Sequence, residues 1–548
     1  MSQTRREAIQ FLGSLGLLGV GGVPVAAIDA AMNGARAQVV PGGVVPPLQA
    51  WLPNWPDMIE IMRQVSKTWR ELGVTIELQQ GDISVWRTQI AGQHKMPHFA
   101  AISWGGTPDR LDPEFFLSIM TSAHGKPGGM NYGGFRNAEY DKLVAEQNEE
   151  FDNAKRQSLV RKAQAVLAEQ DANYVLFFRD VICAYNSERW DNVVPTLGSG
   201  LTHYVPWAFM QMKPKTRRDI VRATVPYDYD TLNPFAALGV SNQTIVRWIY
   251  PTLTYRSAEG DLIPWVAESW TVVDKTTIDV NIRKDMKWDD GRPLTADDVK
   301  FSFDYAAEMK IPSLRMVQDV VGSVEKTGPH SVRFKLKKAY APFVSTVLGF
   351  AFVAPKHIWE SVQDPLNFPN TKPVGAGAFR LVEWKKGEYL HFDANKHFFV
   401  PPNIKSVYLL IVPAMENMLS MIEGGSSDIL AYSIDRRAGD RLEKTKGITV
   451  VSTPSHGFFD IRPNCSMAPL DQPAFRKALQ HGIDREGILS TVFGGAGVIA
   501  NNSTITPAQK FWNNPEIPVP KFDITLGRKI LADAGYSWDK EGRLCFPK

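Results

Sequence analysis

The sequence predicts an α/β fold, because helical and strand-type patterns follow one another along it. Residues 57–72 place apolar side chains at helical spacing, and Gly73 is typical of the residue that ends a helix. Residues 74–78 then alternate apolar and polar side chains, as a half-buried strand does. Such a helix–strand pair needs a sheet on which to bury its apolar faces. At about 150 residues per domain, a chain of 548 residues provides three or four domain-sized units.

Further elements are expected from capping residues and apolar patterning. Helices are predicted to begin after the N-caps Asp152, Thr295 and Asp523. The helix after Asp152 should run to about residue 169, and Asp298 completes a capping box with Thr295. Apolar runs or alternation predict strands at 174–178, 278–282 and 332–336. The basic, proline-containing stretch 211–219 is interpreted as a junction.

Composition excludes several classes of protein. Hydrophobic residues make up 44% of the chain, which is ordinary globular composition and excludes a mainly disordered one. Sixty-one basic against 58 acidic residues leave a net charge of +3, so no nucleic-acid partner is expected. Three cysteines are too few for a disulfide framework or a four-cysteine zinc site.

The first 37 residues resemble an export signal. Arg5 and Arg6 precede the apolar run 11–28, and Ala35-Arg36-Ala37 gives a small–x–small cleavage site. The paired arginines and the glycine-rich core are similar to a twin-arginine signal. Ala8 and Gln10 depart from that motif, so the general secretory route stays as an alternative. A transmembrane anchor is a second alternative, which the glycines and Pro24 of the apolar run and the cleavage site after it disfavour. Residues 38–47 have the composition of a linker.

Catalytic, metal and cofactor signatures are weak throughout. The sequence contains no phosphate-binding loop, no nucleophile elbow and no HExxH zinc motif. Residues 495–500 nearly match a dinucleotide fingerprint, but they follow a predicted helix rather than a strand. His94 and His98 have metal-ligand spacing, yet Pro97 between them argues against a helix. We therefore expect neither an enzyme, nor a metal site, nor a cofactor.

Residues 288–299 (WDDGRPLTADDV) resemble the signature of the family 5 extracellular solute-binding proteins, which serve ABC importers of peptides, nickel and oligosaccharides. Further segments on both sides of this signature are similar to the family and occur in the family's usual order. They are residues 231–235, 264–270, 374–381, 476–479, 483–485 and 532–536. Each match alone is weak. Their shared order over residues 219–548 makes the resemblance specific.

Segments that resemble the last third of such a protein lie in front of this region. They are residues 69–78, 104–116 and 131–143. The chain therefore resembles a circular permutant of the family, with the usual termini joined near residues 200–219. The alternative is a hybrid of two fragments that do not close one core.

The resemblance implies a two-lobed periplasmic binding protein fold of the large type, with an extra subdomain in lobe I. Lobe I is expected over residues 183–462, and lobe II should combine residues 48–182 with 463–548. Such a protein is a periplasmic monomer that traps a small ligand, such as a short peptide, between its lobes. It delivers that ligand to an ABC permease in the inner membrane, and it makes or breaks no bond.

The candidate ligand-binding residues follow from this resemblance. Asp109 is the counterpart of an acidic residue that pairs with the amino terminus of the ligand in peptide-binding relatives, although this loop is two residues longer. The full set of candidates is Trp104, Asp109, Asp112, Asn233, Tyr250, Phe458, Phe459 and Asn464. The alternative interpretations are a ligand sensor, a chaperone-like binding protein, and an enzyme that uses Asp109 and Asp112 as acid and base.

Overall fold

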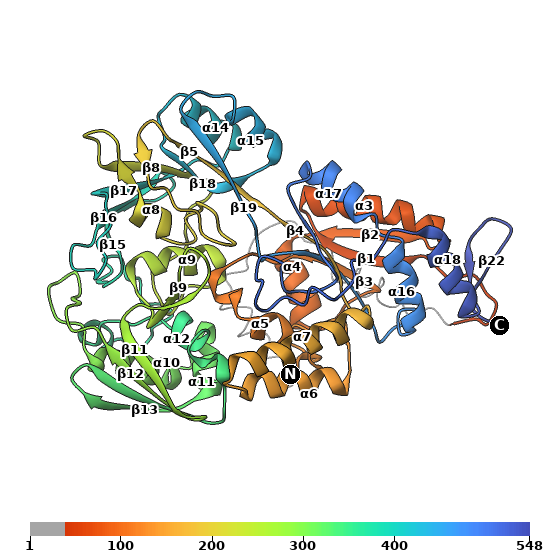
Figure 1. The fold of residues 1–548 in the computed structure, drawn as a ribbon, viewed down its shortest axis with the longest axis horizontal. Helices are drawn as coiled ribbons and strands as arrows, with labels where there is room; N and C mark the ends of the chain where they lie inside the picture. The colour runs from red at the N-terminus through yellow and green to blue at the C-terminus, as the bar shows by residue number, and fades with distance from the viewer. Residues whose placement is uncertain (1–38) are drawn as a thin grey trace.

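The computed structural model describes residues 39–548, except for the side chains of Pro108 and Asp109. The export signal predicted at residues 1–37 lies outside the described residues. The chain forms two lobes side by side, each built on its own sheet (Figure 1). We call residues 181–453 lobe I, and residues 39–180 together with 454–548 lobe II.

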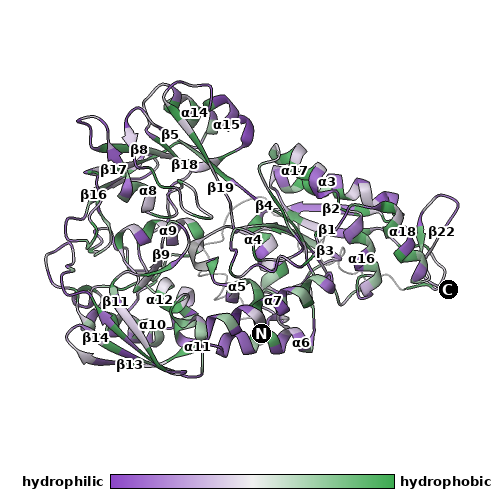
Figure 2. Cartoon of the chain, in the orientation of Figure 1, coloured by the Kyte–Doolittle hydropathy of each residue, from purple (hydrophilic) through white to green (hydrophobic). Residues whose placement is uncertain are grey.

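The sheet of lobe II combines strands from both ends of the described chain. Its order is β2 (Ile76–Gly81), β1 (Leu48–Pro53), β3 (Phe99–Ser103), β20 (Phe459–Pro463), β4 (Tyr174–Arg179) and β21 (Gly497–Ile499). The central strands β1, β3, β20 and β4 are almost wholly buried, whereas the edge strand β2 is largely polar, as its colour in Figure 2 shows. The N-terminal and C-terminal elements therefore lie next to one another in a single core (Figure 1).

The helices of lobe II confirm the predicted caps. Asp152 accepts a hydrogen bond from the Lys155 amide, and Asp523 accepts one from the Leu526 amide. The helices are α3 (Pro56–Glu71), α4 (Ile83–Trp86), η1 (Arg87–Gly92), η2 (Pro108–Leu111), α5 (Pro113–Ser118), η3 (Ser122–His124), α6 (Ala138–Glu149), α7 (Asn153–Glu169), α16 (Pro473–His481), α17 (Arg485–Phe493) and α18 (Ile524–Asp533). The segment resembling a dinucleotide fingerprint follows helix α17, as expected.

The main sheet of lobe I is mixed. Its order is β15 (Phe379–Lys385), β16 (Tyr389–Ala394), β17 (Ser406–Ile411), β8 (Ile220–Val225), β18 (Ile429–Ile434), β5 (Val181–Asn186) and β19 (Ile448–Thr453). β8 runs parallel to both β17 and β18, and the other neighbours are antiparallel. The stretch 211–219, predicted as a junction, leads directly into β8 inside this lobe.

A separate sheet forms the extra subdomain of lobe I. It consists of β11 (Ala267–Asp274), β12 (Thr277–Ile282), β14 (Ser331–Leu336) and β13 (Val321–Gly328). Thr295 and Asp298 form the predicted capping box of α10. The helices of lobe I are α8 (Trp207–Gln211), α9 (Gly239–Ile249), α10 (Ala296–Glu308), η4 (Pro312–Leu314), α11 (Arg315–Val320), η5 (Ala341–Phe343), α12 (Val347–Phe350), α13 (Lys356–Trp359), α14 (Met415–Glu423) and α15 (Arg436–Leu442).

Short two-stranded pairs complete the structure. They are β9 (Thr254–Arg256) with β10 (Leu262–Pro264), β6 (Trp190–Asp191) with β7 (Lys213–Pro214), and β22 (Ser537–Trp538) with β23 (Leu544–Cys545). Between residues 39 and 548, no helix has the length and apolar character needed to cross a membrane.

Two expectations from the sequence are corrected. The described part of the linker is held in place, because Val44 bridges Cys545 and the Val45 amide donates to the Leu544 carbonyl at 2.7 Å. The lobe boundary predicted after residue 462 falls inside β20, a strand of the lobe II sheet. Backbone pairing with distant segments fixes both the position of residues 44–45 and the lobe to which β20 belongs. Local sequence composition does not reveal such pairing.

Candidate functional site

The chain crosses between the lobes twice, and the two crossings lie close together. One is the step from β4 to β5 at Asp180, and the other is residues 454–458 between β19 and β20. The Ser452 hydroxyl donates to the Asp180 carboxylate at 2.8 Å, and the Gly198 amide donates to the Pro454 carbonyl at 3.0 Å. Two adjacent connections of this kind form the geometry of a hinge.

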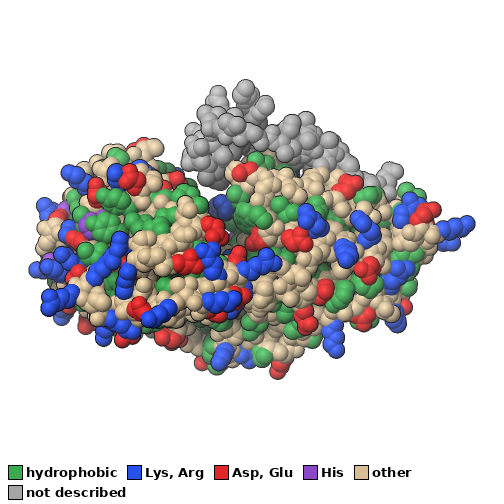
Figure 3. All heavy atoms as spheres, turned by 90° about the horizontal axis from the view of Figure 1, so that it is seen from above, with side chains coloured by type: hydrophobic (Ala, Val, Ile, Leu, Met, Phe, Trp, Pro, Cys, Tyr) green, Lys and Arg blue, Asp and Glu red, His purple; other side chains and the backbone are tan. Residues whose placement is uncertain are grey.

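A cavity of about 140 Å³ lies beside these crossings, and we call it the hinge cavity. Lobe II lines it with Ser103, Trp104, Gly105, Gly106, Arg179, Ser455, Gly457 and Phe459. Lobe I lines it with Val181, Gly198, Ser199, Thr202, Tyr204, Tyr432 and Ser433. From above, the molecular surface dips between the lobes, and basic and acidic side chains are interspersed on that face (Figure 3).

Trp104 follows directly after β3 and is held from several sides. Its ring lies 6.3 Å from that of Phe458 and meets Phe116 edge-on at 6.0 Å. Its indole N–H donates to the Asp460 carboxylate at 3.2 Å. These contacts fix the ring in place before any ligand arrives, which lowers the entropy lost on binding.

Beneath Trp104, Asp460 and Arg462 form an ion pair with side chains fully removed from solvent, 2.9 Å apart. Burial raises the pKa of the Asp460 carboxyl, and the neighbouring guanidinium opposes that shift. Arg462 also lies over the ring of Tyr132, 4.4 Å from its centroid. The pair therefore helps to hold Trp104, a lining residue of the hinge cavity, in place.

Glycines allow the backbones of the two lobes to meet at this point. A Cβ atom on Gly106 of lobe II would lie 2.8 Å from the Gly198 carbonyl oxygen of lobe I, and Gly457 allows a close approach to the Trp104 carbonyl within lobe II. The Ser199 hydroxyl donates to the Gly106 carbonyl at 3.2 Å, from lobe I to lobe II. Larger residues would force the lobes apart here.

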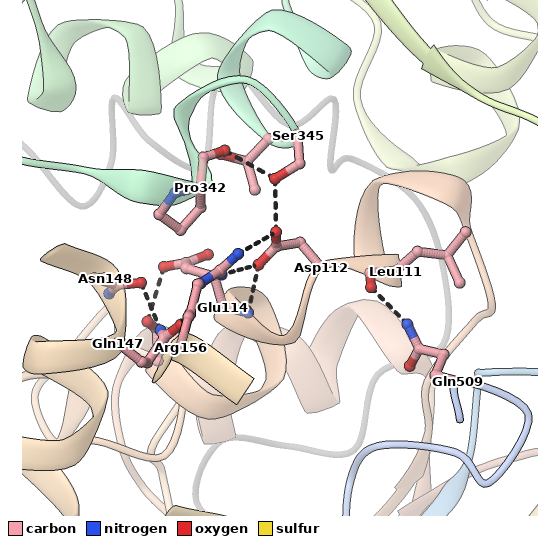
Figure 4. Close-up of polar contacts among 11 residues, drawn as sticks. Leu111, Asp112, Glu114, Gln147, Asn148, Arg156, Pro342, Ser345 and Gln509 are labelled. Atoms are coloured by element: carbon pink, nitrogen blue, oxygen red, sulfur yellow. Dashed lines mark hydrogen bonds and ion pairs between the residues drawn. The ribbon is translucent and has the colours of Figure 1, made fainter. Parts of the chain in front are cut away.

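A second cavity of about 620 Å³, the outer cavity, lies further along the lobe boundary around Asp112. Asp112 is buried and caps α5, and its carboxylate meets Arg156 at 2.6 Å (Figure 4). The Ser345 hydroxyl reaches across from lobe I and donates to the same carboxylate at 2.6 Å. Burial alone would raise the pKa of Asp112, but the Arg156 guanidinium and these hydrogen bonds hold it below its usual value.

The structure brings some of the candidate residues together and separates others. Trp104 and Phe459 line the hinge cavity, and Phe458 packs behind Trp104. Asp112 lines the outer cavity, where Arg156 and Ser345 already occupy its carboxylate. The backbone of Asp109 lies in η2, and its side chain is outside the described residues.

Besides Phe458, three further candidates are not among the lining residues of either cavity. The Asn233 amide donates to the Pro365 and Phe368 carbonyls, and its oxygen accepts backbone amides of the following turn. Tyr250 is buried and bonds Asn370, while Asn464 holds the Met96 carbonyl. Their polar atoms already have structural partners within their own lobes, as buried polar groups usually do.

Sequence reasoning missed the residues of lobe I that line the hinge cavity, and it also missed Arg179 on the lobe II side. Tyr204 and Tyr432 lie in segments for which the family resemblance offered no motif. Arg179 carried a usable signal, since a charged residue ends the buried run 174–178 at a lobe crossing.

Among residues 39–548, no cluster of three potential metal ligands occurs, and Cys183, Cys465 and Cys545 are unpaired. His98 is buried and accepts a bond from the Gln49 amide.

Comparison with known proteins agrees with this architecture. Residues 261–546, just over half of the chain, match the model of the "Bacterial extracellular solute-binding proteins, family 5 Middle". The chain is 28% identical over 348 residues to the oligopeptide-binding protein AppA of Bacillus subtilis (strain 168), which covers 60% of this chain and 63% of AppA. It is 24% identical over 305 residues to the dipeptide-binding protein of Escherichia coli (strain K12), which covers 51% and 56%. The chain thus spans less than two thirds of the length of these relatives.

Solved structures show the same fold. The periplasmic oligopeptide-binding protein of an ABC transporter from Thermotoga maritima aligns with a TM-score of 0.51 and 22% identity, over 59% of this chain and 64% of its own. The substrate-binding protein CtaP from Listeria monocytogenes aligns with a TM-score of 0.50 and 24% identity, over 59% and 66%. The two-lobed fold predicted from the sequence is confirmed. Because the family model matches more than half of the residues, the chain belongs to the family 5 bacterial extracellular solute-binding proteins.

Proposed function

We propose that this protein is the periplasmic solute-binding component of an ABC importer. It captures a small organic solute between its lobes and hands it to a permease in the inner membrane. The observation that carries the proposal is the hinge cavity, which both lobes line beside two adjacent chain crossings. A site divided between two lobes is completed only when they close, so ligand binding and closure are coupled.

The contacts between the lobes support such a closed form. Ser199 bonds Gly106 at the hinge cavity, and Ser345 bonds Asp112 at the outer cavity. These bonds cannot form once the lobes separate, whereas the hinge bond between Ser452 and Asp180 accompanies the crossings themselves. Trp104 and Phe459 would supply apolar walls for the ligand, and the backbone of Asp109 follows Trp104 along the chain in η2.

Family membership supports export of this protein. We further propose that a twin-arginine signal directs it to the periplasm and that it acts there as a monomer. AppA of B. subtilis is an oligopeptide-binding protein, and the E. coli relative is a dipeptide-binding protein. Short peptides are therefore one ligand class to test here. Nickel chelates, oligosaccharides and opines belong in the same screen.

A thermal-shift screen tests the proposal. A solute that binds only the folded protein stabilises it, by about 2.7 kcal/mol at a hundredfold excess over Kd. One class should raise Tm in a saturable manner, and Trp104→Ala should abolish that rise. Trp538→Ala, at the C-terminal hairpin outside both cavities, should retain it. The proposal is wrong if no class shifts Tm, or if Trp104→Ala responds as the wild type does.

We further propose that the chain is a circular permutant of its family. The segment matching the family model ends at residue 546, while strands from residues 48–179 complete the same sheet. Buried contacts support one shared core, because the Trp69 indole donates to the Leu479 carbonyl at 2.8 Å and the Tyr174 hydroxyl to the Arg476 carbonyl at 2.9 Å. Two independent fragments would leave these groups without partners.

Reversing the permutation tests this idea. A variant joins Lys548 to Val39 through a short Gly/Ser linker and opens the exposed stretch between Thr216 and Arg217. We expect one cooperative unfolding transition with a Tm within a few degrees of the parent, because exposed loops tolerate cutting. An opening between Leu430 and Ala431, inside the buried strand β18, is the control that should abolish folding. Failure of the first variant to fold contradicts the permutation.

A further inference from the structure

Resting on the proposed function, we infer the class of solute that the hinge cavity takes. It is a compact organic anion of about one ring, whose carboxylate is held at Arg179. The flat body of this solute lies between aromatic side chains of the two lobes. The size of the cavity limits the dimensions of the solute, its walls favour a flat shape, and its hydrogen-bonding character favours a negative charge.

The size of the cavity limits the solute. Its volume is about 140 Å³. An apolar protein cavity of about 150 Å³ holds a single benzene molecule. The hinge cavity therefore has room for about one six-membered ring, and a charged substituent on that ring would lie at the cavity edge beside Arg179. The 620 Å³ outer cavity is a separate space around Asp112, with different lining residues.

The walls favour a flat solute. Trp104 and Phe459 line the cavity from lobe II, and Tyr204 and Tyr432 line it from lobe I. The Trp104 ring is fixed through its bond to Asp460, and the Tyr204 hydroxyl lies 3.3 Å from that of Tyr227. Aromatic rings that stack or meet edge-on contribute about 0.5–1.5 kcal/mol per pair beyond the area they bury.

Arg179 supplies the charge among the described lining residues. Its guanidinium lies over Phe459 and Phe493, 5.8 and 5.7 Å from the ring centroids, and forms a long ion pair with Asp57 at 4.0 Å. Among residues 39–548, this guanidinium makes no hydrogen bond within 3.5 Å, so a ligand carboxylate would compete only with the long pairing to Asp57 for its fork of donors. No described lining residue is an aspartate or a glutamate.

Two hydroxyl groups in the cavity can also donate, whereas those of Ser199 and Thr202 already donate to backbone carbonyls. The Ser433 oxygen accepts the Ile182 amide at 3.3 Å, and the Ser455 oxygen accepts the Gly457 amide at 2.9 Å. Each of these serines therefore keeps its own proton for an incoming acceptor. A site of donors around one guanidinium favours an anion and disfavours an amine, which would bring a second positive charge into a closing cavity.

Calorimetric titration of the purified protein with three matched probes tests the inference. Benzoate, benzamide and benzylamine share one ring and carry negative, zero and positive charge. Benzoate should bind at least about tenfold more tightly than benzamide, and benzylamine should not bind. Arg179→Gln should weaken benzoate binding about tenfold to a hundredfold, and Arg179→Lys should weaken it less. Arg63→Gln, at an exposed arginine paired with Glu60 on α3, should change nothing.

The outcomes separate this inference from the proposed function. Tighter binding of benzylamine or of the dipeptide Ala-Ala than of benzoate overturns the inference, yet leaves solute capture standing. Benzoate binding that Arg179→Gln does not weaken also overturns it. The charge preference of the wild type is measured without any variant, so a folding defect in Arg179→Gln cannot mask the answer. If no probe binds and no class in the broader screen shifts Tm, the proposed function fails as well.

Discussion

Replacing Ser345 with alanine removes a hydroxyl that joins lobe I to lobe II. The Ser345 hydroxyl donates to the Asp112 carboxylate at 2.6 Å, and Asp112 is buried and already paired with Arg156 (Figure 4). We expect the loss to destabilise the closed form and to leave the open form unchanged, because this bond exists only when the lobes meet. Ser345→Thr, which keeps the hydroxyl, should behave as the wild type does.

The magnitude follows from the contact. A hydrogen bond to a charged group contributes about 1.5–3 kcal/mol. Ser345 is only half-buried, and its hydroxyl also lies 3.0 Å from the Pro342 carbonyl, so the lower end applies. A change of about 1.4 kcal/mol is tenfold in an equilibrium constant. The closed-to-open ratio should therefore fall about tenfold.

The assay combines two measurements. Small-angle scattering of the ligand-free protein reports the balance between closed and open forms, and calorimetry reports the Kd of a solute identified in the screen. When the binding-competent form is populated less, the apparent Kd rises in proportion. Ser361→Ala removes an exposed serine hydroxyl whose bond to the Ile358 carbonyl stays within lobe I, so it is the matched control.

One result would refute the reasoning. If Ser345→Ala keeps the scattering curve and the solute Kd of the wild type, the bond to Asp112 does not hold the lobes together. An equal loss in Ser361→Ala would show that the effect is not specific to the lobe contact.

Three further predictions concern stability and are read from urea unfolding. Arg462→Met leaves the Asp460 charge buried without its partner and should cost about 3–5 kcal/mol, and an unchanged midpoint would contradict the ion pair. Trp69→Ala should cost about 3–5 kcal/mol and keep one transition, whereas a second transition would show that the Leu479 region unfolds separately. Burial raises the pKa of the Asp171 carboxyl to about 6, so the unfolded chain loses this proton first as pH rises. Stability should therefore fall by up to about 3 kcal/mol between roughly pH 4 and 6 and then level off, and Asp171→Asn should remove that slope.

Local chemistry in the sequence determined the individual elements. The caps Asp152, Thr295 and Asp523 begin helices where they were expected, because a capping bond joins atoms three residues apart or fewer. The motif at residues 288–299 likewise indicated the family, since it is one continuous segment. The sequence also indicated Trp104 and Phe459, which line the hinge cavity.

The tertiary structure alone decided which candidates meet at a site. Asn233 and Tyr250 lie in suitable segments, but their polar atoms are used within lobe I. Asp112 looked like a ligand contact, yet Arg156 and Ser345 occupy its carboxylate. No spacing in the sequence shows which partner a side chain will find.

By itself, therefore, the sequence determined the α/β elements, their caps and the family of the chain. Only the tertiary structure decided that strands from both ends share one sheet, and that Arg179, Tyr204 and Tyr432 line the hinge cavity together with Trp104. The physical reason is the range of the interactions. Capping and periodicity depend on neighbours within a few residues, whereas the cavity depends on how two packed lobes orient side chains that are hundreds of residues apart.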